Sequence, residues 1–349
     1  MRVAVIGQGM AGTLAGWALC KRGHEVTWFD NPERSQASRI ASGLYNPIVL
    51  KRMRIVHLSE EMLEYIEPVY RALEDRLQVK FFFPTPIQRI FHSVREENDW
   101  NSKCGSAPWS SHLSDGRSLD GLLAPVGTGT VSQSGWVNTK LLLDQFRHFF
   151  SAQVVTTDLH AKDILFQPEI RIFDKTFDAV VFAEGWRASL DNPYYPKDVF
   201  RPSKGELLSL RIEGLPDDLP PIHYSHFLLP GVEAGTFRTG ATYVHGEPNE
   251  QVSSESRQEL MDELHGILKP GLQAEVIEQK AGVRAATKDR RPLVGQHPIY
   301  RSAYFLNGLG SRSVLMGPYL SEVLADLICD AKPLHPDIDI DRFFRKEQF

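Results

Sequence analysis

The stretch from Val3 to Asp30 constrains the fold more than any other part of this chain. It begins with a short apolar run, Val3–Ile6, which is typical of a buried parallel strand. A G-x-G-x-x-G pattern follows, and apolar residues at helical spacing continue over 10–22. A second apolar run ends at Asp30. The order of strand, glycine turn, helix, strand and acid predicts a βαβ unit that binds a dinucleotide.

Each part of this unit has a physical task. Gly7 permits the tight turn, Gly9 lets the backbone approach a pyrophosphate, and Gly12 lets the helix pack closely on the strand. The N–H groups at the start of the helix offer positive potential to the phosphates. Asp30 can accept hydrogen bonds from both hydroxyls of an adenosine ribose. An acid at this position also repels a 2′-phosphate, which disfavours NADP.

The chain carries one such fingerprint, whereas a flavoprotein reduced by NAD(P)H usually needs a second. If FAD occupies the single site, the electrons come from the organic substrate. A late turn, Gly308–Ser313, lies between a predicted strand over 303–306 and a predicted helix over 314–328. A helix N-terminus there would stabilise the negative charge that reduction places on an isoalloxazine. These features favour FAD, and an NAD-dependent dehydrogenase stays open as an alternative.

Composition narrows the class of protein. The formal net charge of −5 gives no general attraction to phosphate backbones, so bulk nucleic-acid binding is not expected. Cys20, Cys104 and Cys329 show no C-x-x-C spacing, so we predict no metal site and a reducing compartment. No apolar stretch reaches the ~18–20 residues of a membrane helix, and the first residues do not resemble a signal peptide. The sequence therefore predicts a cytoplasmic protein without a transmembrane segment.

The texture of the chain alternates between α/β and β-rich segments, which predicts a discontinuous domain organisation. We expect an α/β fold in which a Rossmann-like FAD-binding domain carries an inserted antiparallel β-sheet domain that binds substrate. The predicted FAD-binding domain comprises residues 1–79, 136–199 and 276–349. The predicted substrate domain comprises residues 80–135 and 200–275. Residues 101–135 are rich in Gly, Ser and Pro, which predicts a long loop.

Seven blocks in order along nearly the whole chain resemble the D-amino-acid oxidase superfamily of FAD-dependent oxidoreductases (the DAO family), the branch with glycine oxidase and sarcosine oxidase. The chain is also similar to the oxidase domain of the bifunctional tRNA wobble-uridine modification protein. The blocks are the glycine loop with Asp30, Arg39–Leu44, Gly135–Asn138, Phe177–Trp186, Arg201–Glu206 with Gly240–Thr242, Gly282–Pro292, and Gly308–Pro318.

The resemblance implies which residues bind FAD. The loop at 42–44 is expected beside the pyrophosphate and flavin, the strand at 154–155 beside the adenine, and the turn at 308–313 at the flavin pyrimidine edge. The implied cofactor-binding residues are Gly7, Gly9, Met10, Ala11, Gly12, Asp30, Asn31, Arg39, Ser42, Gly43, Leu44, Val155, Ala183, Gly185, Trp186, Gly308, Gly310, Ser311, Arg312 and Ser313. Some members attach FAD through a cysteine just before the position of Arg284. Lys280–Val283 contains none, so FAD is predicted to be non-covalent.

The resemblance also implies the substrate site. Arg284 matches the arginine that binds the substrate carboxylate in glycine and D-amino-acid oxidases, a task that suits the guanidinium fork. An ion pair with Asp289 is the structural alternative. Arg312 is expected to stabilise flavin charge. Phe227 and Tyr243 depart from the family at substrate positions, so the pocket is altered; Tyr243 is counted with Arg284 and Arg312 among the catalytic candidates, and Tyr224 and His226 are further lining candidates.

The implied reaction is oxidation of an amine or amino-acid-like substrate by hydride transfer to flavin N5, giving an imine that hydrolyses. The expected partners are a small molecule with a carboxylate and an electron acceptor, O2 or a quinone. The alternatives are a tRNA-modification oxidase acting on a carboxymethylamino base, an NAD-dependent dehydrogenase, and a non-catalytic flavin-binding protein. Lys51, Arg52 and Arg54 form a short basic cluster that would meet an anionic substrate or a flavin phosphate, or form a solvated edge.

Overall fold

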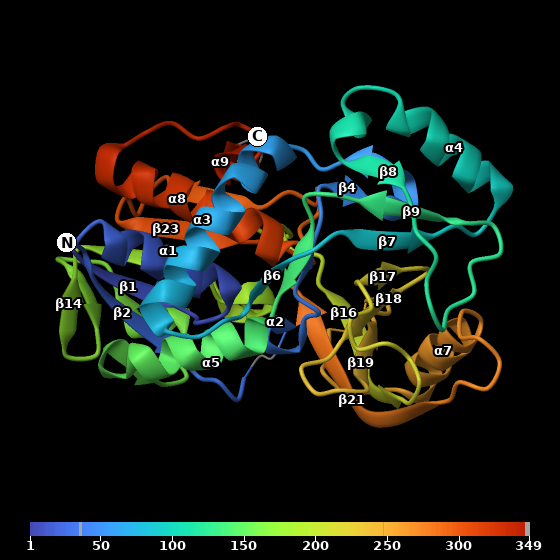
Figure 1. Ribbon diagram of the computed structural model, residues 1–349. Helices are drawn as coiled ribbons and strands as arrows, with labels where there is room; N and C mark the ends of the chain where they lie inside the picture. Colours follow the sequence, from blue (N-terminus) through green and yellow to red (C-terminus); the bar gives the residue numbers. More distant parts are fainter. Residues whose placement is uncertain (35–36, 247, 346–349) are drawn as a thin grey trace.

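The computed structural model describes residues 1–34, 37–246 and 248–345. Figure 1 shows two parts side by side, one built on a sheet covered by helices and one built on a larger, mostly antiparallel sheet. Among the described residues, no helix combines the length and apolar character needed to span a bilayer.

The first part is built on a six-stranded sheet in which five strands run parallel and the edge strand β22 is antiparallel. β1 is central because its apolar run is buried on both faces, as a central parallel strand requires. The turn after β1 and the acid that ends β2 therefore lie at the same carboxyl edge. The spatial order is β11 (Val154–Thr156), β2 (Glu25–Asp30), β1 (Arg2–Ile6), β15 (Ala179–Phe182), β23 (Ala303–Asn307) and β22 (Leu293–Gln296).

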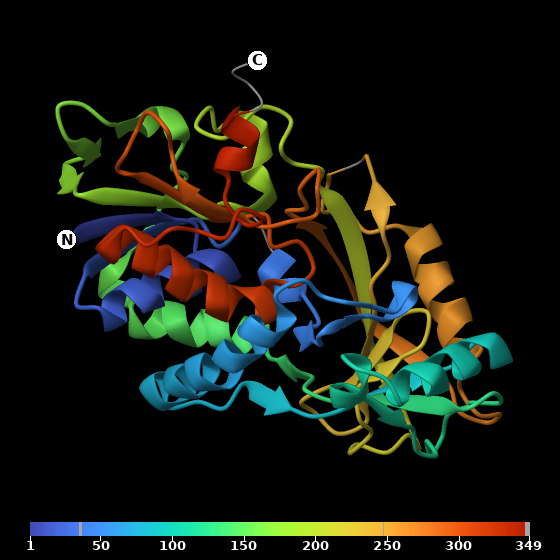
Figure 2. The same ribbon diagram turned by 90° about the horizontal axis from the view of Figure 1, so that it is seen from above.

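Helices cover one face of this sheet and a small antiparallel sheet covers the other, as Figure 2 shows from above. On the first face, Val3 and Val5 share a core with four helices. On the second face, Ala4 and Ile6 pack with the small sheet. The helices are α1 (Met10–Lys21), α3 (Ser59–Leu77), α5 (Thr139–Phe149) and α8 (Ser313–Asp330), and the small sheet is β12 (Ile164–Leu165), β13 (Ile170–Ile172) and β14 (Lys175–Phe177).

The second part is built on a larger sheet with one parallel pair, β17 with β7. Helix α7 (Ser254–His265) packs on one face through Leu260 and Leu264. Helix α4 (Val94–Cys104) packs on β9 through Trp100. The order is β20 (Val244–His245), β16 (Ser203–Ile212), β19 (Thr236–Gly240), β18 (Phe227–Pro230), β17 (Ile222–His223), β7 (Ile87–Ile90), β9 (Thr128–Val131) and β8 (Leu113–Asp115), with β21 (Ala274–Arg284) also paired to β16.

Short sheets join the two parts. β3 (Leu44–Tyr45), β10 (Gly135–Val137) and β6 (Phe82–Pro84) form an antiparallel sheet. β4 (Ile48–Val49) and β5 (Arg54–Ile55) form a hairpin. The remaining helical segments are α2 (Ala37–Ile40), α6 (Ala188–Asp191), α9 (Asp341–Phe344), η1 (Leu50–Arg52), η2 (Trp109–Ser111), η3 (Ser151–Gln153), η4 (Ala161–Asp163) and η5 (Gly185–Arg187).

The structure confirms the predicted fold class: a Rossmann-like unit with a second, mostly antiparallel sheet. The prediction of a long loop over 101–135 is wrong, because this stretch contains the end of α4 and the strands β8 and β9. Its strands are short and rich in Gly, Ser and Thr, which hides their alternation. The division into two domains stays a prediction. Strand β21 crosses its boundary at 275/276 and pairs with β16 throughout, so we place that boundary after Arg284.

Candidate active site

The glycine turn is shaped by close backbone approach. Gly7 has φ +97°, and a Cβ there would stand 2.6 Å from the carbonyl oxygen of Ala183 at the end of β15. A Cβ at Gly12 would overlap the carbonyl oxygen of Gly7. Helix α1 has Gly9 as its N-cap, without a side-chain cap. Gly9 has no side chain to cap the start of α1, and the N–H of Met10 donates instead to Ser38 Oγ at 3.2 Å, a contact that the sequence did not indicate.

Asp30 lies beside this turn and is held from two sides. Its Oδ1 accepts from the backbone N–H of Gln8 at 2.9 Å, and its Oδ2 accepts from Arg147 Nη1 of α5 at 2.9 Å. Arg147 also donates to Thr156 Oγ1 at 2.7 Å. Thr156 lies on β11, which pairs with β2. This strand pairing places Val155 next to β2, where the adenine was expected. No sequence motif indicated Arg147, because its contact with Asp30 depends on α5 crossing the end of β2.

Arg147 should matter for cofactor binding because it fixes the carboxylate of Asp30, which is expected to face the ribose. We expect Arg147→Ala to weaken FAD binding about tenfold, since an Asp30 that has lost a charge-assisted partner is free to rotate. Titration of the apoprotein with FAD, followed by quenching of flavin fluorescence, measures this. His148→Ala, which removes an exposed side chain from the same helix, is the control. Equal affinities of the two variants would contradict a positioning role.

Two other predicted cofactor residues near this end make contacts within the protein. Arg39 of α2 pairs with Asp144 of α5. Asn31 donates to Asp158 Oδ1 at 2.8 Å. Both residues lie near the end of the site where the adenosine of the cofactor is expected. Their direct contact with the cofactor stays a prediction.

The loop at 42–44 is fixed from the second sheet. Gly43 has φ +78°, and a Cβ there would overlap the carbonyl oxygen of Val137. Arg238 of β19 donates to the carbonyl oxygens of Ala41 and Ser42 at 3.5 and 3.2 Å. Burial lowers the pKa of Arg238 to about 10. Arg238 thus ties the second sheet to the predicted cofactor loop, a link that no local pattern indicated.

The turns at 183–186 and 308–313 are joined by one buried amide. Asn307 Nδ2 donates to the carbonyl oxygen of Gly185 at 3.0 Å, and Asn307 Oδ1 accepts from the N–H of Gly308 at 2.8 Å. Gly185 and Gly310 have φ of +65° and +56°, and a Cβ at either would meet open space. The two turns therefore form one continuous edge at the carboxyl ends of β15 and β23.

Glu184 lies in the first of these turns, where it is half-buried and both its carboxyl oxygens accept from Asn192 Nδ2. Burial raises the pKa of Glu184 to about 8, from an ordinary value of 4.5. Between these values the native state holds a proton that the unfolded chain releases. Stability from this group is therefore complete below about pH 4.5 and is lost as the pH rises through about 8.

We expect Glu184→Gln to remove this pH dependence. The melting temperatures of the parent and the variant should agree near about pH 5, and the variant should be the more stable at about pH 8–9. Thermal unfolding followed by circular dichroism in excess FAD measures the difference. Parallel pH profiles of the two proteins would show that Glu184 is already ionised at neutral pH.

Arg284, Tyr243 and Arg312 come together although they lie far apart in the sequence. The Arg284 guanidinium stacks on the Tyr243 ring at 3.9 Å. Arg312 is the N-cap residue of α8 and lies within electrostatic range of the Tyr243 side chain. Burial lowers the pKa of both arginines below the ordinary value. The two cations line one region at the start of α8.

Arg284 is held by backbone carbonyls rather than by an acid. Nη1 and Nη2 donate to the carbonyl oxygens of Lys204 and Thr242, each at 3.1 Å. A Cβ at Gly205 would overlap the guanidinium, so glycine makes the space for it. Among residues 1–34, 37–246 and 248–345, no carboxylate pairs with Arg284. The proposed ion pair with Asp289 is not formed, because Asp289 pairs with Arg342 at 2.8 Å.

The face of β16 that carries Gly205 and Leu207 looks toward the first part of the molecule. Leu207 and Phe227 form an apolar cluster with Leu44 and Trp136. Residues of the opposite face turn to α7: Lys204 pairs with buried Glu206 at 3.0 Å, and Glu206 accepts from Ser253.

Tyr224 and His226, the further candidates for lining the pocket, lie just after β17, and their side chains point toward α7. Tyr224 bonds to Thr239 Oγ1 at 2.6 Å within the α7-facing core. His226 lies 3.4 Å from Glu259 of α7. Tyr224 and His226 are therefore on the side of the sheet away from Arg284.

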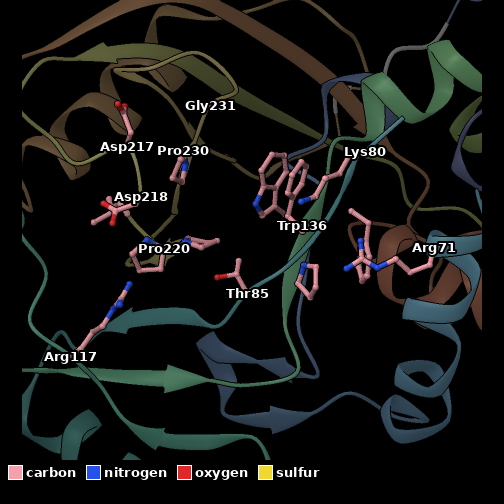
Figure 3. A pocket seen from close by; sticks show the side chains of 15 residues that line it. Arg71, Lys80, Thr85, Arg117, Trp136, Asp217, Asp218, Pro220, Pro230 and Gly231 are labelled. Carbon is pink, nitrogen blue, oxygen red and sulfur yellow. The ribbon is translucent and has the colours of Figure 1, made fainter. Parts of the chain in front are cut away.

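A separate pocket of about 530 Å³ has Trp136 in its wall (Figure 3). Trp136 stacks on Phe83 with ring centroids 4.3 Å apart, and Thr85, Pro220 and Pro230 lie around it. None of the predicted site residues lines this pocket. The pocket is thus distinct from the Arg284 cluster.

The fold and the glycine-turn site define a dinucleotide-binding enzyme with a second sheet over the carboxyl edge of the first. Residues 2–327 match the family model described as DAO, FAD dependent oxidoreductase. The chain therefore belongs to the DAO family and is an FAD-dependent oxidoreductase. The alternatives of an NAD-dependent dehydrogenase and of a non-catalytic flavin-binding protein lose their support.

Individual relatives agree with this family. The chain is 25% identical over 401 residues to a tRNA 5-methylaminomethyl-2-thiouridine biosynthesis bifunctional protein MnmC from Psychrobacter sp. (strain PRwf-1), covering 94% of this chain and 52% of that protein. It is 22% identical over 357 residues to a glycine oxidase from Geobacillus kaustophilus (strain HTA426), covering 93% and 92%. The chain thus spans about half the length of the bifunctional relatives it matches.

Solved structures show the same fold. A glycine oxidase from Bacillus cereus ATCC 14579 superposes with a TM-score of 0.79 at 22% identity, covering 95% of this chain and 96% of that chain. An iminodiacetate oxidase from Chelativorans sp. BNC1 superposes with a TM-score of 0.80 at 17% identity, covering 98% of each chain.

The residues at the carboxyl edge fit FAD. The glycine N-cap at the start of α1 suits a pyrophosphate, and Asp30 suits a ribose. In the described part of the chain, the indole N–H of Trp186 is buried without a partner, as expected of a donor that meets a ligand. A Cβ placed at Gly185 or Gly310 would meet no protein atom within 4 Å, so the protein does not fill the space directly beside these glycines.

Proposed function

We propose that this protein oxidises the CH–NH bond of a small amine that carries a carboxylate. The observation that carries the proposal is the Arg284 guanidinium, which is half-buried, faces the first part of the molecule and lacks an acidic partner among the described residues. A partly desolvated cation without a counter-charge is costly, and a substrate carboxylate would offset that cost. Glycine oxidase and iminodiacetate oxidase, by their names, act on such compounds.

The residues of the chain have separable tasks in this reaction. FAD supplies the oxidant, which accepts a hydride from the substrate carbon next to nitrogen. Gly7–Gly12 and Asp30 would hold its phosphates and ribose, and the joined turns would hold its ring system. Arg284 would bind the substrate carboxylate and orient the reacting C–H, with the Tyr243 ring beside it. Arg312, with the start of α8, would place positive potential where the ring system becomes more negative on reduction.

We infer that FAD is held without a covalent bond. Lys280–Val283 contains no cysteine, and Cys20, Cys104 and Cys329 lie on α1, α4 and α8. Acid precipitation should therefore release all the flavin into the supernatant. Flavin that stays with the pellet would contradict this inference.

An anaerobic screen tests the proposed reaction. FAD-loaded protein is mixed with glycine, N-methyl and N-carboxymethyl amino acids, the corresponding amines without a carboxylate, and 2-hydroxy acids. We expect rapid bleaching of the flavin spectrum by a carboxylate amine, and much slower bleaching by its decarboxylated analogue. Bleaching by hydroxy acids alone would overturn the proposal. Readmitting O2 or adding a quinone then shows which acceptor restores the colour.

A tRNA base is a second candidate substrate, favoured by the hairpin of β4 and β5. Lys51, Arg52 and Arg54 are exposed there, and within the described ranges none of them forms an ion pair. Such a basic edge could contact an anionic polymer locally despite the net charge. Bleaching by tRNA that carries a carboxymethylamino base, without bleaching by free amino acids, would select this candidate. The cytoplasmic location stays a prediction.

A further inference from the structure

Three metal-ligating side chains meet at the surface of the first part, away from the Arg284 cluster. His57 lies between β5 and α3, while His335 and Asp337 lie between α8 and α9. His57 Nε2 is 2.7 Å from Asp337 Oδ2, and the imidazole rings of His57 and His335 have centroids 5.5 Å apart. The ligand atoms of all three residues lie within 4.8 Å of one another. Figure 1 shows the start of α3 and α9 at the same edge of the molecule.

The carboxylate of this triad is already oriented by a neighbour. Arg291 Nη1 donates to Asp337 Oδ1 at 2.5 Å, which turns the other oxygen, Oδ2, toward the two histidines. His335 Nδ1 lies 4.0 Å from Oδ2 and accepts from the backbone N–H of Asp337 at 3.2 Å. A partner that fixes a ligating carboxylate from behind is the usual arrangement around protein-bound metals.

We propose that His57, His335 and Asp337 form a binding site for a divalent transition metal of the Zn²⁺ type. Two imidazole nitrogens and one carboxylate oxygen suit such an ion better than Mg²⁺ or Ca²⁺, which prefer oxygen ligands. Bonds of about 2.0–2.1 Å require the three ligand atoms to draw closer together. The side chains of His57 and His335 are 59% and 43% exposed, so they can swing inward without repacking a core.

The site would connect segments that are far apart in sequence. A bound ion would join the entry to α3 to the segment after α8. That segment is already bonded to the loop that follows Arg284, through Arg291 with Asp337 and through Asp289 with Arg342. We therefore expect the ion to stabilise the C-terminal segment, with a melting temperature that rises with metal concentration. The sequence predicted no metal site because its pattern contained no local cluster of ligands.

Zn²⁺ titration of the FAD-loaded full chain, purified without a histidine tag, tests the proposal. Isothermal calorimetry should show one Zn²⁺ ion per chain. His57→Ala and His335→Ala should each bind it at least about tenfold more weakly, and Zn²⁺ should no longer raise their melting temperatures. His265→Ala, an exposed histidine at the end of α7, should behave like the parent.

The proposed site is wrong if the parent binds no Zn²⁺. It is also wrong if His57→Ala and His335→Ala bind Zn²⁺ as tightly as the parent does. A visible flavin spectrum like that of the parent is required of each variant as evidence that it is folded. Because the readouts are metal affinity and melting temperature, they do not depend on which substrate the enzyme oxidises.

Discussion

Arg284→Ala is expected to lower kcat/KM for a carboxylate amine about 100-fold while FAD stays bound. In the proposed complex the guanidinium would donate charge-assisted hydrogen bonds to the substrate carboxylate, and their loss would cost about 3 kcal/mol. Arg284 itself is held by the carbonyl oxygens of Lys204 and Thr242, so its removal leaves no buried acid unpaired among the described residues. Steady-state kinetics together with an FAD titration measure both effects.

Three comparisons sharpen this test. Arg211→Ala removes an exposed arginine from β16 and should leave kcat/KM unchanged. Gly205→Ala keeps the arginine but pushes its guanidinium aside, so it should mimic much of the loss. A decarboxylated substrate should respond little to Arg284→Ala. If FAD affinity falls as steeply as kcat/KM, Arg284 is a structural residue and the proposed carboxylate site is wrong.

Gly12→Ala is expected to reduce FAD affinity more than about 100-fold. A Cβ at this position overlaps the carbonyl oxygen of Gly7, so the turn or the helix has to move. Backbone adjustment of this kind costs about 3 kcal/mol or more, and it displaces the N–H groups that would face the pyrophosphate. The purified variant should be colourless, and it should take up little FAD in a titration.

Gly105→Ala is the matched control, because a Cβ there meets no atom within 4 Å and the backbone φ is −86°. A far-ultraviolet spectrum checks that Gly12→Ala is folded. If the variant does not fold, Arg147→Ala still tests the same end of the site, because it changes only side-chain contacts. A folded Gly12→Ala variant with the FAD affinity of the parent would show that the cofactor does not bind at this turn.

Local features were predictable from the sequence because their causes are local. The apolar run of β1, the glycines of the turn and the apolar spacing of α1 follow from neighbouring residues. The late turn at 308–313 was predictable for the same reason, because it lies between a strand and a helix. The strands β8 and β9 were missed because they are short, and because β9 joins the sheet through β7, which lies about 40 residues earlier in the chain.

The sequence by itself therefore determined the dinucleotide-binding unit, the fold class, the cofactor family and the candidacy of Arg284. Only the tertiary structure decided what holds these residues in place. Arg147 reaches Asp30 across 117 positions, and Arg238 reaches Ser42 across 196. Such contacts depend on which helix crosses the end of which strand and on which face of β16 looks toward the first part. That geometry is set by packing of the whole core, so no pattern of neighbouring residues encodes it.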